Sequence, residues 1–109
     1  MIKETLGVHI RGLRKQNGYT LTKLAAALDL DQSTLSKIEN CKKKIPFEAL
    51  SKLANIFNLD LEELESEFYS EKIAEMLYPI KNSKAILNLA EEKIEYVKLR
   101  QTKQSKLAL

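Results

Sequence analysis

With 109 residues the chain has room for one domain of ordinary size, and its hydrophobic fraction of 44% and charged fraction of 30% indicate a globular protein rather than a disordered or fibrous one. The formal net charge of +3 is unevenly spread: residues 1–60 carry 10 Lys and Arg against 6 Asp and Glu, residues 61–80 carry 1 against 6, and residues 81–109 carry 7 against 3. The single cysteine excludes an intramolecular disulfide. The sequence shows neither an apolar run of membrane-spanning length nor the pattern of a signal peptide. We therefore expect a cytoplasmic protein without membrane contact.

The first sixty residues are predicted to form four short helices, because their apolar residues recur at intervals of three and four. These positions are Leu6, Ile10 and Leu13; Leu21, Leu24, Ala25 and Leu28; Leu30, Leu35 and Ile38; and Phe47, Leu50, Leu53, Ala54 and Phe57. Asn17-Gly18 ends the first helix with residues that accept a left-handed backbone. Thr20 and Asp31 are good N-caps for the second and third helices, and Pro46 fits the first turn of the fourth.

Two longer helices are predicted for the rest of the chain. The fifth covers residues 61–78 and ends before Pro79, which cannot continue a helix. Its apolar positions are Leu61, Leu64, Phe68, Ile73, Met76 and Leu77. The sixth runs from Ser83 to about Gln104, and no strand pattern appears. We therefore expect an all-α protein: a five-helix domain over residues 1–68, with its fifth helix continuing to about residue 78, and a C-terminal helical extension over 79–109.

The third predicted helix, residues 31–40, has a polar exposed side. At about 100° per residue, Leu35 and Ile38 define its buried side. The polar side chains that point away are Ser33, Ser36, Lys37 and Asn40, with Gln32 in the first turn. One lysine among uncharged polar groups suits the reading of base edges, because an amide can form two hydrogen bonds with adenine and a lysine can reach guanine acceptors. With small Ala25 where the second helix would cross the third, the pattern is that of a helix-turn-helix.

Residues 6–64, LGVHIRGLRKQNGYTLTKLAAALDLDQSTLSKIENCKKKIPFEALSKLANIFNLDLEEL, resemble the lambda-repressor-like, Cro/XRE-type helix-turn-helix domain. The resemblance implies that the third helix enters the major groove of double-stranded DNA. It assigns base contacts to Gln32, Ser33, Ser36 and Lys37, and phosphate contacts to Thr20, Thr34, Asn40, Lys42, Lys43 and Lys44. It also implies a partly buried ion pair between Arg14 and Glu39, which agrees with the position of Glu39 beside the core face.

Three positions depart from the family pattern. Leu21 stands where relatives usually have a glutamine that touches phosphate, so that contact is lost here. Asp29 replaces the usual glycine of the turn, and we expect the turn to survive because Asp tolerates the left-handed region. Cys41 replaces the usual glycine after the recognition helix, which leaves open how the following lysines approach the DNA backbone.

The sixth helix carries a heptad-like apolar seam at Leu87, Ala90, Ile94 and Val97. The seam could fold back onto the fifth helix, or it could pair with a second copy of the chain. Pairing is favoured, because one recognition helix gives few base contacts and a symmetric dimer doubles them. The function predicted is a transcription regulator, of the kind of a phage repressor or a restriction-modification controller, that binds an operator as a homodimer and represses or activates a neighbouring promoter. The alternative is an antitoxin-like or regulator-binding protein whose C-terminal helix binds another protein.

Little in the sequence supports catalysis, since it has one His, one Cys and no glycine-rich phosphate loop. His9 has no ligand-type neighbours at metal-binding spacing, so a surface role is predicted. Cys41 has no second thiol nearby in the sequence and is expected to be inert. Tyr19, Phe47 and Phe57 are expected in the core rather than stacked on bases. The sequence therefore predicts neither an enzyme nor a bound cofactor or metal.

Overall fold

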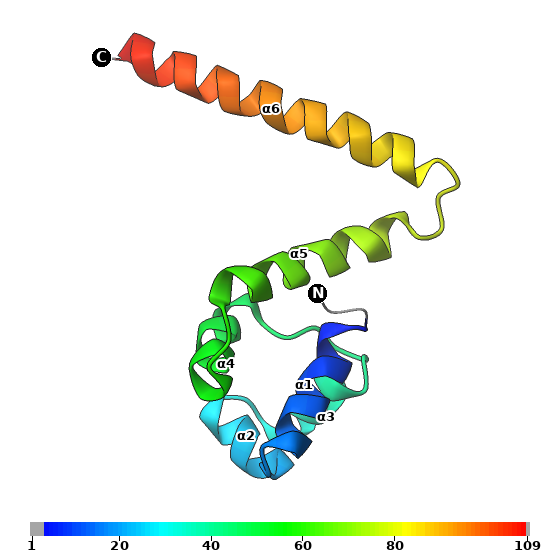
Figure 1. Ribbon diagram of the computed structural model, residues 1–109, viewed down its shortest axis with the longest axis vertical. Coiled ribbons are helices and arrows are strands. Elements are labelled where there is room, and N and C mark those ends of the chain that lie inside the picture. The colour runs from blue at the N-terminus through cyan, green and yellow to red at the C-terminus, as the bar shows by residue number, and fades with distance from the viewer. Residues whose placement is uncertain (1–3, 109) are drawn as a thin grey trace. The chain divides into compact units, whose positions relative to one another are not determined.

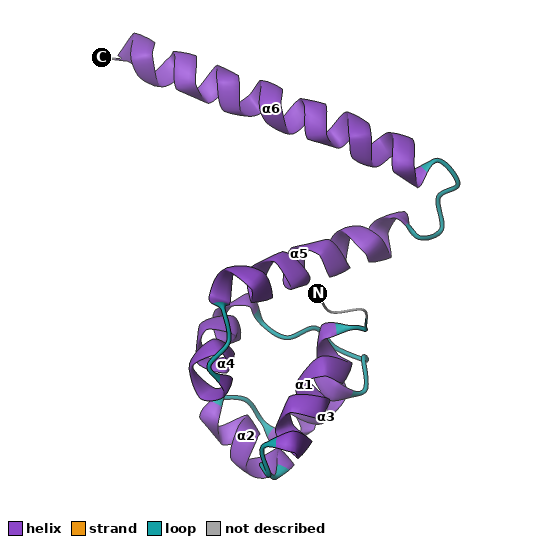
Figure 2. Ribbon diagram, viewed as in Figure 1, coloured by secondary structure: helices purple, strands orange, loops and turns teal. Residues whose placement is uncertain are grey.

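The computed structural model describes residues 4–108, and within that range every regular element is a helix (Figures 1 and 2). The elements in order are α1 (Leu6–Gln16), α2 (Leu21–Ala27), α3 (Gln32–Glu39), the 3₁₀ turn η1 (Phe47–Ala49), α4 (Leu50–Phe57), α5 (Leu61–Leu77) and α6 (Ser83–Ala108). The all-α class is confirmed. The chain divides into two compact units, Met1–Ala74 and Glu75–Leu109, with the division inside α5.

Threonine hydroxyls cap the first two helices. Thr5 lies in the extended region before α1 and accepts a hydrogen bond from the Val8 N–H at 3.4 Å. Thr20 holds the same position before α2 and accepts from the Lys23 N–H at 3.1 Å, as the sequence predicts. Asp31 precedes α3 with an extended backbone but makes no side-chain hydrogen bond to that helix. Two of the three helices that build the helix-turn-helix and its support therefore begin with a satisfied cap.

The start of α4 differs from the prediction. Pro46 has an extended backbone and lies before the 3₁₀ turn η1, which is closed by a hydrogen bond of 3.0 Å from the Ala49 N–H to the Pro46 carbonyl. The expectation that Pro46 lies in the first turn of an α-helix was wrong, because a tighter turn separates it from α4. Phe47, at the start of that turn, is 39% exposed rather than buried, although its ring packs against Phe68 with 5.5 Å between centroids.

The core of the first unit is formed by one face from each of its helices. Its side chains with almost no exposure are Ile10, Leu24, Leu28, Leu35, Ile38, Leu50 and Leu53. α5 contributes Leu64 and Phe68, but Ile73 is 44% exposed and Met76 69%. At about 100° per residue, Ile73 lies some 140° around the helix from Phe68, so it cannot share that buried face. No helix within the described residues is long and apolar enough to cross a membrane.

Candidate DNA-binding surface

A tight turn joins α2 to α3. Asp29 has φ +56°, the left-handed conformation in which glycine is usual, so the turn forms here with an aspartate. The Leu30 N–H donates to the Ala25 carbonyl at 2.9 Å, and the Ala25 side chain is buried where the two helices meet. The Asp29 carboxylate forms an ion pair with Lys52 of α4. The turn therefore fixes α3 across α2 while its aspartate is held by a third helix.

α3 presents a polar side without acidic groups. Leu35, Ile38 and Glu39 are buried, as the helical spacing predicts for the first two. The predicted base-contacting residues Gln32, Ser33 and Lys37 are exposed and Ser36 is half-buried; among the predicted phosphate contacts on this helix and its cap, Asn40 is exposed and Thr34 is half-buried. The outward side of α3 thus has the donors, acceptors and single positive charge that base edges and phosphates require.

A hydrogen bond outside the core links the first turns of α2 and α3. The Thr22 hydroxyl donates to Oε1 of Gln32 at 2.8 Å, and both side chains are exposed. The sequence pattern gave no sign of this bond, because the two residues are ten positions apart on different helices.

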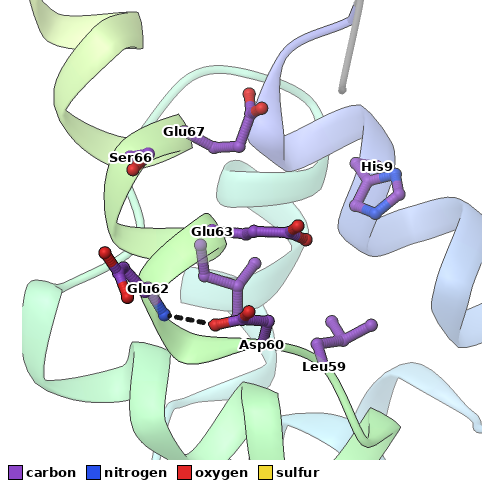
Figure 3. A pocket seen from close by; sticks show the side chains of 8 residues that line it. His9, Leu59, Asp60, Glu62, Glu63, Ser66 and Glu67 are labelled. Carbon is purple, nitrogen blue, oxygen red and sulfur yellow. Dashed lines mark hydrogen bonds between the residues drawn. The ribbon is translucent and has the colours of Figure 1, made fainter.

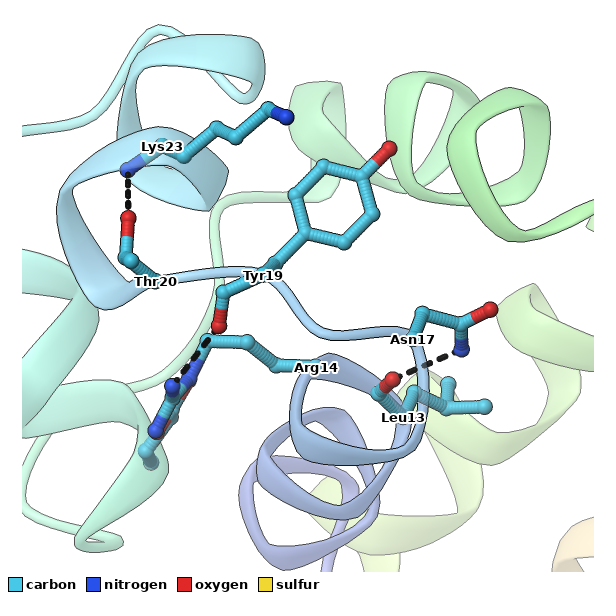
Figure 4. Close-up of polar contacts among 7 residues, drawn as sticks. Leu13, Arg14, Asn17, Tyr19, Thr20 and Lys23 are labelled. Carbon is cyan, nitrogen blue, oxygen red and sulfur yellow. Dashed lines mark hydrogen bonds and ion pairs between the residues drawn. The ribbon is translucent and has the colours of Figure 1, made fainter.

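The Arg14–Glu39 pair lies between α1 and α3. Arg14 Nε is 2.8 Å from Glu39 Oε2, and the second guanidinium nitrogen Nη2 is 3.1 Å from Oε1, so the pair is bidentate. Nη1 of Arg14 also donates to the Tyr19 carbonyl at 3.1 Å, which Figure 4 shows beside the Thr20 cap of α2. The Glu39 side chain is only 4% exposed and that of Arg14 15%. One arginine therefore links the end of the recognition helix to the segment that leads into α2.

α1 touches the end of α3 through backbone. A Cβ placed on Gly7 would lie 2.1 Å from the Ile38 carbonyl oxygen, so only glycine allows this approach. Just beyond, Cys41 is exposed and has φ +62°, a left-handed backbone conformation that favours glycine. Its Sγ lies 3.1 Å from Oγ1 of Thr5, the cap of α1. The exit from the recognition helix is therefore held against the start of α1.

The three lysines after α3 have different surroundings. Lys42 and Lys43 are exposed. Lys44 Nζ lies 3.0 Å from Oε1 of Glu71 on α5, and Oε2 of the same carboxylate accepts a hydrogen bond of 2.8 Å from the Leu6 N–H at the start of α1. The phosphate contact assigned to Lys44 would require this pair to open, whereas Lys42 and Lys43 form no ion pair within the part of the chain that the structure describes.

An acidic hollow of about 600 Å³ lies elsewhere on the first unit (Figure 3). Its lining residues are His9, Leu59, Asp60, Glu62, Glu63, Leu64, Ser66 and Glu67. Figure 3 shows the acidic side chains on and beside the first turns of α5, with His9 across from them on α1. His9 Nδ1 is 3.5 Å from Glu4 Oε1, and among the described residues no three His, Cys, Asp or Glu side chains are placed so that they could hold a metal ion. Such a surface repels the DNA backbone, so it lies outside the candidate interface.

In the second unit the predicted seam of α6 is exposed. Leu87, Ile94 and Val97 are between 46% and 53% exposed, and Ala90 is exposed as well. The four side chains follow one side of the helix at spacings of three, four and three.

A recognition helix held across a supporting helix, with an acid-free polar side and lysines after it, defines a helix-turn-helix DNA-binding protein. The family model described as helix-turn-helix matches residues 10–64, and the chain belongs to this family, in its Cro/XRE-type branch of transcription regulators. A search of curated proteins finds no match.

Several solved structures are similar. The clp gene regulator ClgR from Corynebacterium glutamicum has 23% identity over 84% of each chain and a TM-score of 0.50. The biofilm regulator SinR in complex with DNA has 30% identity, with 51% of this chain and 90% of that chain covered and a TM-score of 0.46. The SinR–SinI complex has 24% identity over 90% of this chain and 99% of that chain, with a TM-score of 0.47.

Proposed function

We propose that the protein is a sequence-specific transcription regulator that binds an operator as a homodimer, with α3 in the major groove. The observation that carries the proposal is the exposed side of α3, where uncharged polar groups and one lysine stand on a helix whose buried side is locked into the core. An exposed helix face without acidic groups can approach DNA closely, and amides and hydroxyls suit base edges.

Phosphate contacts surround that side of α3. Lys42 and Lys43 follow the helix, and Thr20 caps α2 with its hydroxyl accepting from the Lys23 N–H, which leaves the hydroxyl proton for a phosphate oxygen. Such contacts set orientation and account for most of the affinity, while the residues on α3 supply the sequence preference. The base contacts are therefore all assigned to α3, whereas the phosphate contacts are assigned to Thr34 and Asn40 of that helix and its C-cap and to residues on either side of it.

Homodimerisation is proposed through α6. Its seam of Leu87, Ala90, Ile94 and Val97 is exposed in a single chain, and apolar residues at this spacing bury themselves by pairing helices. Two recognition helices would then contact half-sites about one turn of DNA apart, 10 to 10.5 base pairs. Binding at an operator in the cytoplasm would repress or activate the neighbouring promoter.

A second candidate function is favoured by the same exposed seam. If α6 binds another protein, the chain is an antitoxin-like or regulator-binding module and DNA contact is secondary. The two functions differ in the oligomeric state of the purified protein, because in a homodimer a second copy of the same chain covers the seam and no different protein is needed.

Selection of bound sites from a random DNA pool by the purified full-length protein tests the proposal. We expect a two-fold symmetric site, together with a dimeric mass by light scattering. A monomer that selects no sequence at moderate ionic strength would refute the regulator function, whereas a monomer that selects one half-site would refute only the homodimer.

A further inference from the structure

The carboxylate of Glu71 in α5 holds one of the lysines to which a phosphate contact is assigned. Its Oε1 lies 3.0 Å from Lys44 Nζ, and its Oε2 accepts a hydrogen bond of 2.8 Å from the Leu6 N–H. We propose that Glu71 is an autoinhibitory residue: its negative charge cancels the charge that Lys44 would offer to the DNA backbone, and so lowers the affinity for DNA of every sequence. This inference rests on the proposed function, in which the lysines after α3 face phosphates.

Glu71 is fixed in place by its second oxygen. The Leu6 N–H belongs to the first turn of α1, where a backbone donor has no carbonyl partner within its own helix. Oε2 satisfies that donor, and the Glu71 side chain is only 21% exposed, whereas the Asp29 carboxylate that pairs with Lys52 is 75% exposed. The carboxylate beside Lys44 is therefore part of the packed structure, and its effect exceeds that of a pair of flexible surface side chains.

The balance of charge shows what the pair does to DNA binding. A lysine that neutralises a phosphate releases one condensed cation, which adds about 0.9 to the slope of log affinity against log salt concentration. The Lys44–Glu71 pair has no net charge, and when it opens the carboxylate takes up a cation in place of the one that the phosphate releases. The three N–H donors of the ammonium do not alter this balance, because the competition is for one positive charge and not for hydrogen bonds. Lys44 therefore adds little to the slope.

Salt does not relieve the inhibition. The two charged atoms are 3.0 Å apart, well within the Debye length of about 10 Å at 0.1 M salt, and the carboxylate is largely shielded from solvent. The two preceding lysines, Lys42 and Lys43, are exposed and form no ion pair within the described part of the chain. Of the three consecutive lysines, two therefore present their charge to DNA while the third is neutralised by Glu71.

The test compares two glutamates of α5. Glu71→Gln removes the charge and keeps an oxygen for the Leu6 N–H, whereas Glu62→Gln removes the same charge from an exposed residue of the acidic hollow, outside the candidate interface. Affinities of the full-length proteins are measured by fluorescence anisotropy for a site selected by wild type and for a scrambled duplex. At about 50 mM salt, Glu71→Gln should bind both duplexes about fivefold more tightly than wild type. Its slope should be steeper by about 0.9, so the gain should shrink about 3.5-fold by about 200 mM salt.

Lys44→Ala, made in wild type and in Glu71→Gln, shows which lysine carries the effect. It should change the slope little in wild type and should remove the added slope from Glu71→Gln, while Glu62→Gln should keep the wild-type slope. Equal slopes in Glu71→Gln and Glu62→Gln, or an equal loss from Lys44→Ala in both backgrounds, would overturn the inference. Equal binding of the selected and scrambled duplexes by wild type would instead refute the sequence-specific function, and the slopes would still decide the role of Glu71.

Discussion

Two glycines of α1 provide a matched test of how the recognition helix is held. A Cβ on Gly7 would lie 2.1 Å from the Ile38 carbonyl oxygen and 3.2 Å from its carbon, whereas a Cβ on Gly12 of the same helix would meet nothing within 4 Å. Alanine is favoured over glycine within a helix by about 1 kcal/mol, so Gly12→Ala should raise the free energy of unfolding by about 0.5–1 kcal/mol. The same substitution at Gly7 carries that gain together with a collision between the new Cβ and the backbone carbonyl of Ile38.

The collision should outweigh the gain. To restore an ordinary contact, α1 and α3 must separate by more than an ångström at Gly7, and overpacking of this kind costs typically 1–3 kcal/mol and sometimes more. We expect Gly7→Ala to lower stability by about 2 kcal/mol, or roughly 8–16 °C in Tm for a domain of this size. Urea unfolding followed by circular dichroism measures both variants. If Gly7→Ala proves as stable as Gly12→Ala, the close approach of α1 to α3 described here is incorrect.

Other substitutions test the ion pair, the lysines and the seam. Arg14→Met leaves the Glu39 carboxylate buried without its partner and should cost about 3–5 kcal/mol by chemical unfolding, whereas adding Glu39→Leu should recover most of the loss; no recovery would mean that packing, not charge, dominates. Lys43→Ala should weaken binding to every DNA sequence alike and make the slope of log affinity against log salt concentration shallower by about one. Lys44→Ala should change that slope by less, because the Lys44 ammonium is paired with the Glu71 carboxylate. Equal changes of slope in the two variants would contradict this distinction. Ile94→Glu should give a monomer by light scattering and reduce operator affinity, and a dimer that persists would exclude the α6 seam.

Much of the first unit follows from local patterns. The intervals between apolar residues place Leu35 and Ile38 on the buried side of α3, and Thr20 before an apolar run predicts the cap of α2. The left-handed conformation of Asp29 agrees with the expectation that the turn survives with an aspartate, whereas the conformation of Cys41 was left open. Each of these features depends on neighbours within a few residues, which is why the sequence alone is informative about them.

Other features depend on distances in space. The pairing of Lys44 with Glu71 joins residues 27 positions apart, and nothing in the spacing of either residue indicates it. The bond from Thr22 to Gln32 depends on the angle at which α2 crosses α3. Ile73 is exposed because it lies on a different side of α5 from the buried Phe68, and the partly exposed Phe47 begins a 3₁₀ turn that the apolar spacing did not predict.

The carboxylate of Glu71 also bears on the order in which the domain is completed. Its bond to the Leu6 N–H spans 65 positions, so a chain made from its N-terminus waits for that partner roughly 3 to 13 seconds at the usual 5–20 residues per second. The Thr5 cap can hold the start of α1 from the beginning of that interval, and the exit of α3 can do so once Cys41 has been made. The contacts of Glu71 with the start of α1 and with Lys44 can therefore form only after the whole of α3 has been made and is available to fold.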